Sequence, residues 1–268
     1  MRNFMEKSTV YFTDFRCKVG TSQLDKLKKL CIAAGIKDID MDGKFVAIKM
    51  HFGELGNLAF LRPNYAKVVA DLCKELGGMP FLTDCNTLYP GSRKNALEHM
   101  DCANLNGFNT ITTGCQIIIG DGLRGTDDVE VPVENAEYCP TARIGRAVMD
   151  ADIFISLTHF KGHEATGFGG AIKNIGMGCG SRATYARASA IILYDFCQSL
   201  GIPVMVYGHS AYSGVELYFY AEFDSIDKLD RYRLMDISAR GNNRDGAALR
   251  FVAEQLAKRP EDIRLLIL

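Results

Sequence analysis

Short apolar runs alternate with amphipathic segments along most of this chain. Runs bounded by polar residues or glycine predict buried strands at residues 44–52, 79–85, 115–123 and 152–158. Apolar residues recur at helical spacing between them, in residues 22–35, 62–78 and 92–108. Ser22 is a candidate cap of the first helix, and Pro63 stands in the first turn of the second. The rhythm predicts an α/β fold with a mainly parallel sheet and helices on both faces, in three layers.

The remaining segments predict further elements. Strands are expected at residues 8–15, 202–208 and 263–268, with an edge strand at 128–133 because it contains Pro132. Helices are expected at residues 141–151, 183–201, 225–241 and 246–259, and a short one around Lys173. No repeat or linker interrupts the chain. We therefore expect a single α/β domain over residues 1–268, or two packed lobes of residues 1–122 and 123–268.

Composition narrows the class of protein. A formal net charge of -1 gives no basic excess, which argues against a general nucleic-acid binder. No apolar run reaches the roughly 20 residues that span a bilayer, and the N-terminus lacks the apolar core of a secretory signal. The nine cysteines are scattered, without a C-x-x-C pair, which favours free thiols over disulfides or a cysteine-only cluster. We expect a cytoplasmic protein with neither a membrane nor a nucleic-acid partner.

Polar side chains follow the predicted strands where each one ends. Ligands of open parallel sheets bind beyond the carboxyl ends of the strands, so these residues are site candidates. They are Lys49, His51 and Glu54; Asp84, Asn86, Thr87 and Tyr89; Asp121; and His159, Lys161, His163 and Glu164.

Each group also has a structural explanation. Lys49 and His51 could lie on a solvent-facing edge, and Asn86 or Thr87 could cap a turn. Arg93, expected near a helix N-terminus, is unfavourable there unless an anionic ligand or an acidic partner such as Asp84 lies nearby. Asp121 between glycines suits a cation site or a common turn.

The segment HFKGHE contains the most specific pattern. His159 and His163 could bind a metal together with a carboxylate, or could act as proton donor and acceptor beside Lys161. Two loop histidines bonded to the backbone are the structural alternative. The candidate ligands of a divalent metal are His51, Glu54, Asp121, His159 and His163.

The segment GFGGAIKN predicts an anion site. Backbone N–H groups of the Gly169–Gly170 turn at a helix start would bind an anion, and Lys173 and Asn174 lie one turn inside that helix. The segment matches neither the dinucleotide motif nor the ATPase phosphate loop. Cys179 is a candidate nucleophile or soft ligand, and a small buried thiol is at least as plausible.

Several of these stretches resemble the family catalogued as domain of unknown function 362. They are AIKMHFGELGN with the following RP, PFLTDCNTLYPGSRKNALEH, the NGF of residues 106–108, IIIGDGLRG, and DADIFISLTHFKGHEATGFGGAIKNIGMGCGSR. The resemblance extends from about Val46 to Arg182. Its GFGGAIKN loop with nearby histidines is also distantly similar to the cofactor-holding region of nickel-pincer lactate racemase.

The resemblance implies a core domain with its site and no settled reaction. Many members carry ferredoxin-type modules that bind two four-iron clusters, whereas this chain has none of their cysteine runs, so we expect no intrinsic iron–sulfur cluster. After Arg182 the family pattern of Gly-Lys is replaced by Ala183 and Thr184. This departure raises the alternative that the scaffold is kept and the activity lost.

Two functions follow as hypotheses. The first is an enzyme that acts on a small anionic substrate, with a divalent metal as a candidate cofactor. Its expected catalytic residues are His159, His163, Lys161 and Asp84, and its expected binding residues are Lys49, Gly169, Gly170, Lys173 and Asn174. The second is a non-catalytic accessory protein that docks an iron–sulfur redox partner or a cofactor.

Overall fold

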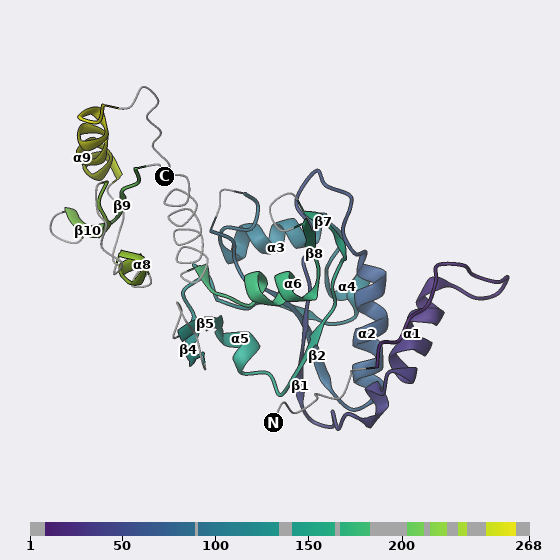
Figure 1. The fold of residues 1–268 in the computed structure, drawn as a ribbon. Coiled ribbons are helices and arrows are strands. Elements are labelled where there is room, and N and C mark those ends of the chain that lie inside the picture. Colours follow the sequence, from purple (N-terminus) through teal and green to yellow (C-terminus); the bar gives the residue numbers. More distant parts are fainter. Residues whose placement is uncertain are drawn as a thin grey trace, which may run out of the picture. The chain divides into compact units, whose positions relative to one another are not determined.

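The computed structural model describes residues 9–88, 91–133, 141–163, 167–182, 203–211, 215–223, 230–234 and 245–260 (Figure 1). The chain packs into two compact units. The first is Met1–Val131 with Arg143–Arg182, and the second is Pro132–Ala142 with Ala183–Leu268. The expectation of one domain, or of lobes 1–122 and 123–268, stays a prediction.

Between residues 9 and 182 the described helices are α1 (Gln23–Ala33), η1 (Ile36–Asp38), α2 (Pro63–Glu75), α3 (Ala96–Leu105), α4 (Thr110–Thr113), α5 (Arg146–Met149) and α6 (Ala171–Gly178). The strands are β1 (Phe45–Lys49), β2 (Met79–Asp84), β3 (Gln116–Ile119), β4 (Asp128–Pro132), β5 (Thr141–Gly145), β6 (Ile153–Ser156), β7 (Lys161–His163) and β8 (Gly167–Gly169). Ser22 caps α1 and Pro63 begins α2, as the sequence predicts.

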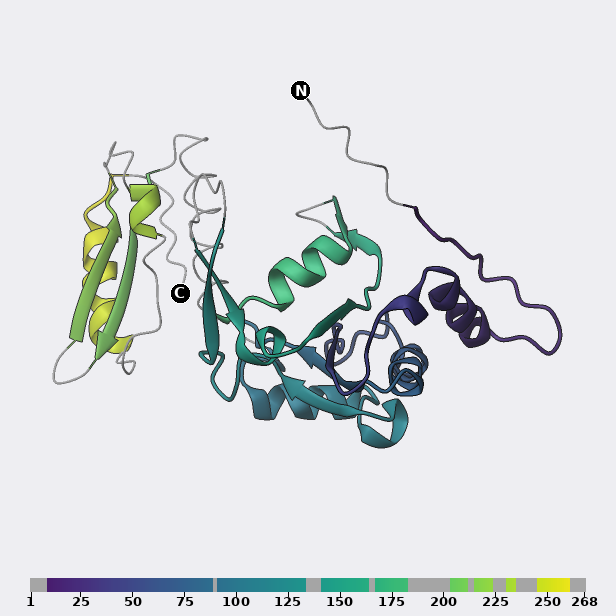
Figure 2. The same ribbon diagram turned by 90° about the horizontal axis from the view of Figure 1, so that it is seen from below.

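A four-stranded parallel sheet in the order β3-β2-β1-β6 organises the first unit. In its register Val46 lies between Pro80 and Ile153. Helix α3 covers one face of this sheet and α6 covers the other (Figure 2). The predicted α/β fold, with a mainly parallel sheet between helices, is confirmed.

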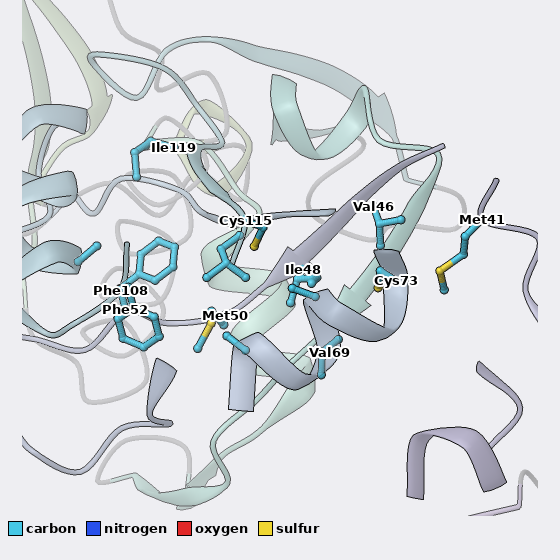
Figure 3. Close-up of a cluster of buried hydrophobic side chains, with 14 residues drawn as sticks. Met41, Val46, Ile48, Met50, Phe52, Val69, Cys73, Phe108, Cys115 and Ile119 are labelled. Carbon is cyan, nitrogen blue, oxygen red and sulfur yellow. The ribbon is translucent and has the colours of Figure 1, made fainter. Parts of the chain in front are cut away.

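The core fills the face of the sheet that packs on α2 and α3. Val46, Ile48 and Met50 alternate along β1 and its continuation, and all three are fully buried. They pack with Val69 and Cys73 of α2 (Figure 3). Because the side chains of a strand alternate between faces, Lys49 points away from this core.

Three predicted elements were wrong in part. Residues 9–15 form no helix or strand, and Val10 and Phe12 are mostly exposed, since no neighbouring strand pairs with them. The helix expected at residues 141–151 begins instead as β5, which pairs with β4, and only α5 is helical. Helix α3 begins at Ala96, later than the expected residue 92, because Asn95 caps it there.

In the second unit the described elements are β9 (Val206–Ala211), β10 (Val215–Ala221), α8 (Asp230–Arg233) and α9 (Asp245–Ala257). Strands β9 and β10 pair antiparallel, and Tyr220, Ala221 and Leu234 form a small core. The strand expected at residues 202–208 overlaps β9 only at residues 206–208, and residues 203–205 are not strand. Helix α9 matches the helix expected at 246–259, and β10 was not predicted. The helix expected at 183–201 and the strand at 263–268 lie outside the described residues.

Within the described ranges, no helix is long and apolar enough to cross a membrane.

Candidate functional site

The carboxyl ends of β1, β2 and β6 meet at one edge of the sheet. Because the three strands are parallel and in register, Lys49 lies between Thr83 and Ser156. The loops that leave this edge carry most of the side chains predicted from the sequence. The expectation that these loops share one side of the sheet is therefore met.

Lys49 and Asp84 form a buried ion pair at this edge. They are 1% and 2% exposed, and Nζ of Lys49 lies 3.0 Å from Oδ1 of Asp84. The same ammonium donates to Oδ1 of Asn174 in α6, at 2.7 Å. Asn174 also donates to Oγ1 of Thr158, at 2.9 Å, which links α6 to the segment after β6. Lys49 therefore joins β1, β2 and α6 and has little access to a ligand.

Arg93 neutralises the second oxygen of Asp84. Its Nη1 donates to Oδ2 of Asp84 at 3.2 Å, and its Nε donates to Glu54 at 2.7 Å. The sequence-based prediction of Asp84 as an acidic partner of Arg93 is confirmed, although Arg93 precedes α3. Burial raises the pKa of Asp84, but the charges of Lys49 and then Arg93 outweigh it and hold the pKa below its usual value. Asp84 is consequently an ionised counter-ion with no free proton-accepting role in this arrangement.

His99 of α3 also contacts this network and was missed by the sequence analysis. It is completely buried, with Nε2 3.8 Å from Oδ2 of Asp84. Neither ring nitrogen has a hydrogen-bond partner among the residues described. Burial, opposed in part by Asp84, lowers its pKa to about 4, so the ring is neutral. Its spacing from Cys102 and Ala103, on the buried face of α3, was the signal available in the sequence.

Gly178 allows the pair of Lys49 and Asp84 to form. A Cβ atom at this position would lie 2.7 Å from Oδ1 of Asp84 and would overlap Nζ of Lys49. The carbonyl of Gly178 accepts the N–H of Cys85 at 3.0 Å. The GMGCG segment thus packs its backbone directly on the ion pair. Cys179 is buried there and its pKa is raised to about 11, chiefly by burial, so the thiol is protonated.

His51 is a neutral, half-buried imidazole in the loop after β1. Its Nδ1 accepts the N–H of Gly53 at 2.8 Å, so the proton of the neutral ring is on Nε2. Burial, followed by the charge of Arg93, lowers its pKa to about 4. Gly53 has a φ of 85° and a Cβ there would lie 2.8 Å from Phe60, so this tight loop requires glycine. The alternative of a solvent-facing edge is excluded for Lys49, which is buried.

Asp121 and Asn86 form a separate buried pair. The backbone N–H and the side-chain amide of Asn86 donate to Oδ1 of Asp121 at 2.9 and 2.8 Å. The amide also donates to the carbonyl of Gly122 at 2.8 Å, so Asn86 joins two loops and does not merely cap its own turn. Burial raises the pKa of Asp121 to about 7. Its Oδ2 has no hydrogen-bond partner in the described part of the chain.

Lys161 and Lys173 lie side by side over Gly169. A Cβ at Gly169 would be 3.7 Å from Cδ of Lys173 and 3.8 Å from Cγ of Lys161. Burial, then the charges of Lys161 and Arg93, lower the pKa of Lys173. Gly170 is the N-cap of α6 and supplies no side-chain hydrogen bond to it, so no side chain caps the first N–H groups of α6. Lys161 of β7 and Lys173 of α6 thus place two cations near the N-terminus of α6.

The remaining predicted residues are less defined. His159 is half-buried and makes no hydrogen bond to the described residues. His163 lies in β7, but its side chain and all of Glu164 and Tyr89 lie outside the described residues. No group of three or more His, Cys, Asp or Glu side chains in the described ranges is arranged to hold a metal ion. The metal site of His51, Glu54, Asp121, His159 and His163 stays a prediction.

Comparisons with known proteins give one structural and one family match. The chain is similar to the lactate racemase apoprotein from Thermoanaerobacterium thermosaccharolyticum, with 12% identity and a TM-score of 0.39. The match covers 76% of this chain and 50% of that one. No curated protein matches. The model of the family described as Domain of unknown function (DUF362) matches residues 46–200, more than half of the chain. These residues include the strand-end loops described above, and the chain belongs to the DUF362 family.

Proposed function

We propose that the chain is an enzyme that binds a small anionic substrate at the carboxyl edge of the sheet. The observation that carries this proposal is the pair of lysines over Gly169. Lys161 and Lys173 have no ion-pair partner within the described ranges, and the charge of Lys161 is close enough to contribute to the lowered pKa of Lys173. The uncapped N-terminus of α6 adds partial positive charge beside them. A bound carboxylate or phosphate would neutralise the lysine charges and would interact favourably with the partial positive charge of the helix N-terminus.

The buried network of Lys49, Asp84, Arg93 and Asn174 holds the elements that carry the anion site in place. Lys49, Asp84 and Arg93 are held against one another, so they position α6 and the loop after β1. Lys49 and Asn174 are therefore assigned to holding α6 in place, and Lys173 with the Gly169–Gly170 turn to holding the anion. In this proposal the residues that bind the substrate differ from those that hold the site in place.

The proposed chemistry is proton transfer by histidine. His51 is neutral at physiological pH and makes no hydrogen bond to the described residues through Nε2, so this N–H can donate a hydrogen bond to a substrate oxygen there. The proposed acid–base groups are His159, His163 and Lys161, on the segment that also carries Lys173. Asp84 acts through Lys49 and Arg93 and does not exchange a proton itself.

Anion binding is tested by titrating inorganic phosphate and acetate by isothermal calorimetry. Lys173→Met and Lys161→Met should each weaken binding about tenfold or more, because a hydrogen bond to a charged group contributes roughly 1.5–3 kcal/mol. Lys37→Met removes one exposed positive charge outside the site and serves as the control. If the protein binds neither these anions nor a longer carboxylate, or if the three variants behave alike, the anion site is wrong.

Catalysis is tested separately from binding. Small carboxylates that bind should exchange a carbon-bound hydrogen for deuterium in D₂O, which NMR detects, and His159→Gln should slow this exchange. Binding without any exchange would contradict the proposed proton transfer and favour an accessory role.

A divalent metal bound by His159 and His163 is a separate part of the proposal and is tested separately. Metal titration followed by His159→Ala and His163→Ala decides this. Unchanged metal binding in both variants would remove these histidines as ligands.

A further inference from the structure

The outward face of α6 is apolar. Ala171, Ile172, Ile175 and Gly176 are all exposed, and the Ile172 side chain is 88% exposed. Surface helices of globular proteins normally present polar residues to solvent and apolar residues to the core. Helix α6 departs from this rule, since Asn174 is turned toward Lys49 and only Lys173 is charged.

This apolar face borders the cationic pair directly. At 100° per residue, the order around the helix is Ile175, Ile172, Gly176 and Lys173. A Cβ at Gly176 would meet no atom within 4 Å, so open space separates Ile172 from Lys173. An apolar group could therefore lie along Gly176 against Ile172 while a charged group on the same molecule contacts Lys173.

We propose that the ligand of this site is an amphiphilic anion, such as a medium-chain carboxylate, whose apolar part lies on the outward face of α6. This inference rests on the proposed anion site and adds the class of substrate. Lys161 and Lys173 bind the charged end of the ligand, and the alkyl chain of the ligand passes over Gly176 and contacts Ile172 and Ile175.

The size and charge of the surface favour a small ligand over a protein. A stable protein interface buries roughly 800 Å² per partner. The exposed side chains of two isoleucines and one alanine offer far less area than this, and the aliphatic parts of both lysines lie against Gly169. One anionic group with one attached chain matches that arrangement, whereas an acidic protein surface would need charges spread over a wider area.

The dependence of affinity on the alkyl length of the ligand tests the inference. Acetate, butyrate and octanoate, each below its micelle concentration, are titrated into the full-length protein by isothermal calorimetry. Each methylene buried on α6 should tighten binding up to about fourfold, so octanoate should bind at least tenfold more tightly than butyrate. Ile172→Ser should remove most of this gain. Ile111→Ser is the matched control, because Ile111 of α4 is 91% exposed and lies outside the site.

The outcomes separate this inference from the proposed function. Equal affinity for acetate, butyrate and octanoate would overturn the amphiphilic ligand and leave the anion site standing. Absence of binding by all three carboxylates and by phosphate would overturn both. Cosedimentation with phosphatidylglycerol vesicles without binding of free octanoate would assign α6 to a lipid surface and would also overturn the inference.

Discussion

At the scale of single residues, two glycines of α6 differ in what surrounds them. Gly176 faces open space, whereas Gly178 packs on Nζ of Lys49 and on Oδ1 of Asp84. Gly178→Ala should lower the free energy of unfolding by about 1–3 kcal/mol, because the added methyl group overlaps a buried ion pair. Gly176→Ala should raise stability slightly, since alanine is a better helix former by about 1 kcal/mol. Chemical denaturation of both variants checks this, and equal effects would contradict the packing described.

His99 gives a second prediction at this scale, on pH dependence. Its pKa is about 4 in the folded chain, below the 6.5 of a free imidazole, so the unfolded chain binds more protons between these values. Stability should therefore fall as the pH drops from 6.5 to 4, by up to roughly 3 kcal/mol from this group. His99→Gln should reduce this dependence without removing it, because the pKa of His51 is also lowered to about 4. Denaturation midpoints at pH 7.5 and 4.5 measure it, and an unchanged slope in the variant would show that His99 does not titrate in this way.

At the scale of elements, α3 depends on its N-cap. Asn95 accepts the N–H of Glu98 at 3.0 Å, and Arg93 and His99 lie on either side of this cap. Asn95→Ala should cost about 1 kcal/mol and should also loosen the contacts of Arg93 with Asp84. Asn104→Ala, at an exposed position of the same helix, should cost nothing. Thermal unfolding of the two variants gives the comparison, and equal losses would argue against a specific role of the cap.

At the scale of the first unit, Asp84 connects elements far apart in the sequence. It lies at the end of β2 and contacts Lys49 of β1 and Arg93, while Lys49 reaches Asn174 of α6. Asp84→Asn would leave the buried Lys49 without its counter-ion, while Arg93 would keep Glu54, and the loss should be about 3–5 kcal/mol. Asp71→Asn breaks a pair that is exposed to solvent and should cost less than about 1 kcal/mol. Similar losses in the two variants would contradict the buried network.

The sequence predicted the parallel sheet well because its signals are local. The apolar runs of β1, β2, β3 and β6 and the cap at Ser22 each act within a few residues. The expected strand at residues 8–15 failed for the opposite reason. An alternating pattern allows a strand, but pairing needs a neighbour that the pattern does not contain.

The structure changed the interpretation of the segment HFKGHEATGFGGAIKN more than that of any other segment. The sequence alone determined that glycines, lysines and histidines follow a buried strand, because these are facts of order and spacing. Only the tertiary structure decided which lysine is free for a ligand. Lys49 and Lys173 look equivalent in the sequence, yet Lys49 is buried against Asp84 and Asn174 while Lys173 lies beside Lys161. The physical reason is that burial and charge pairing depend on segments more than a hundred residues apart, and folding alone brings these together.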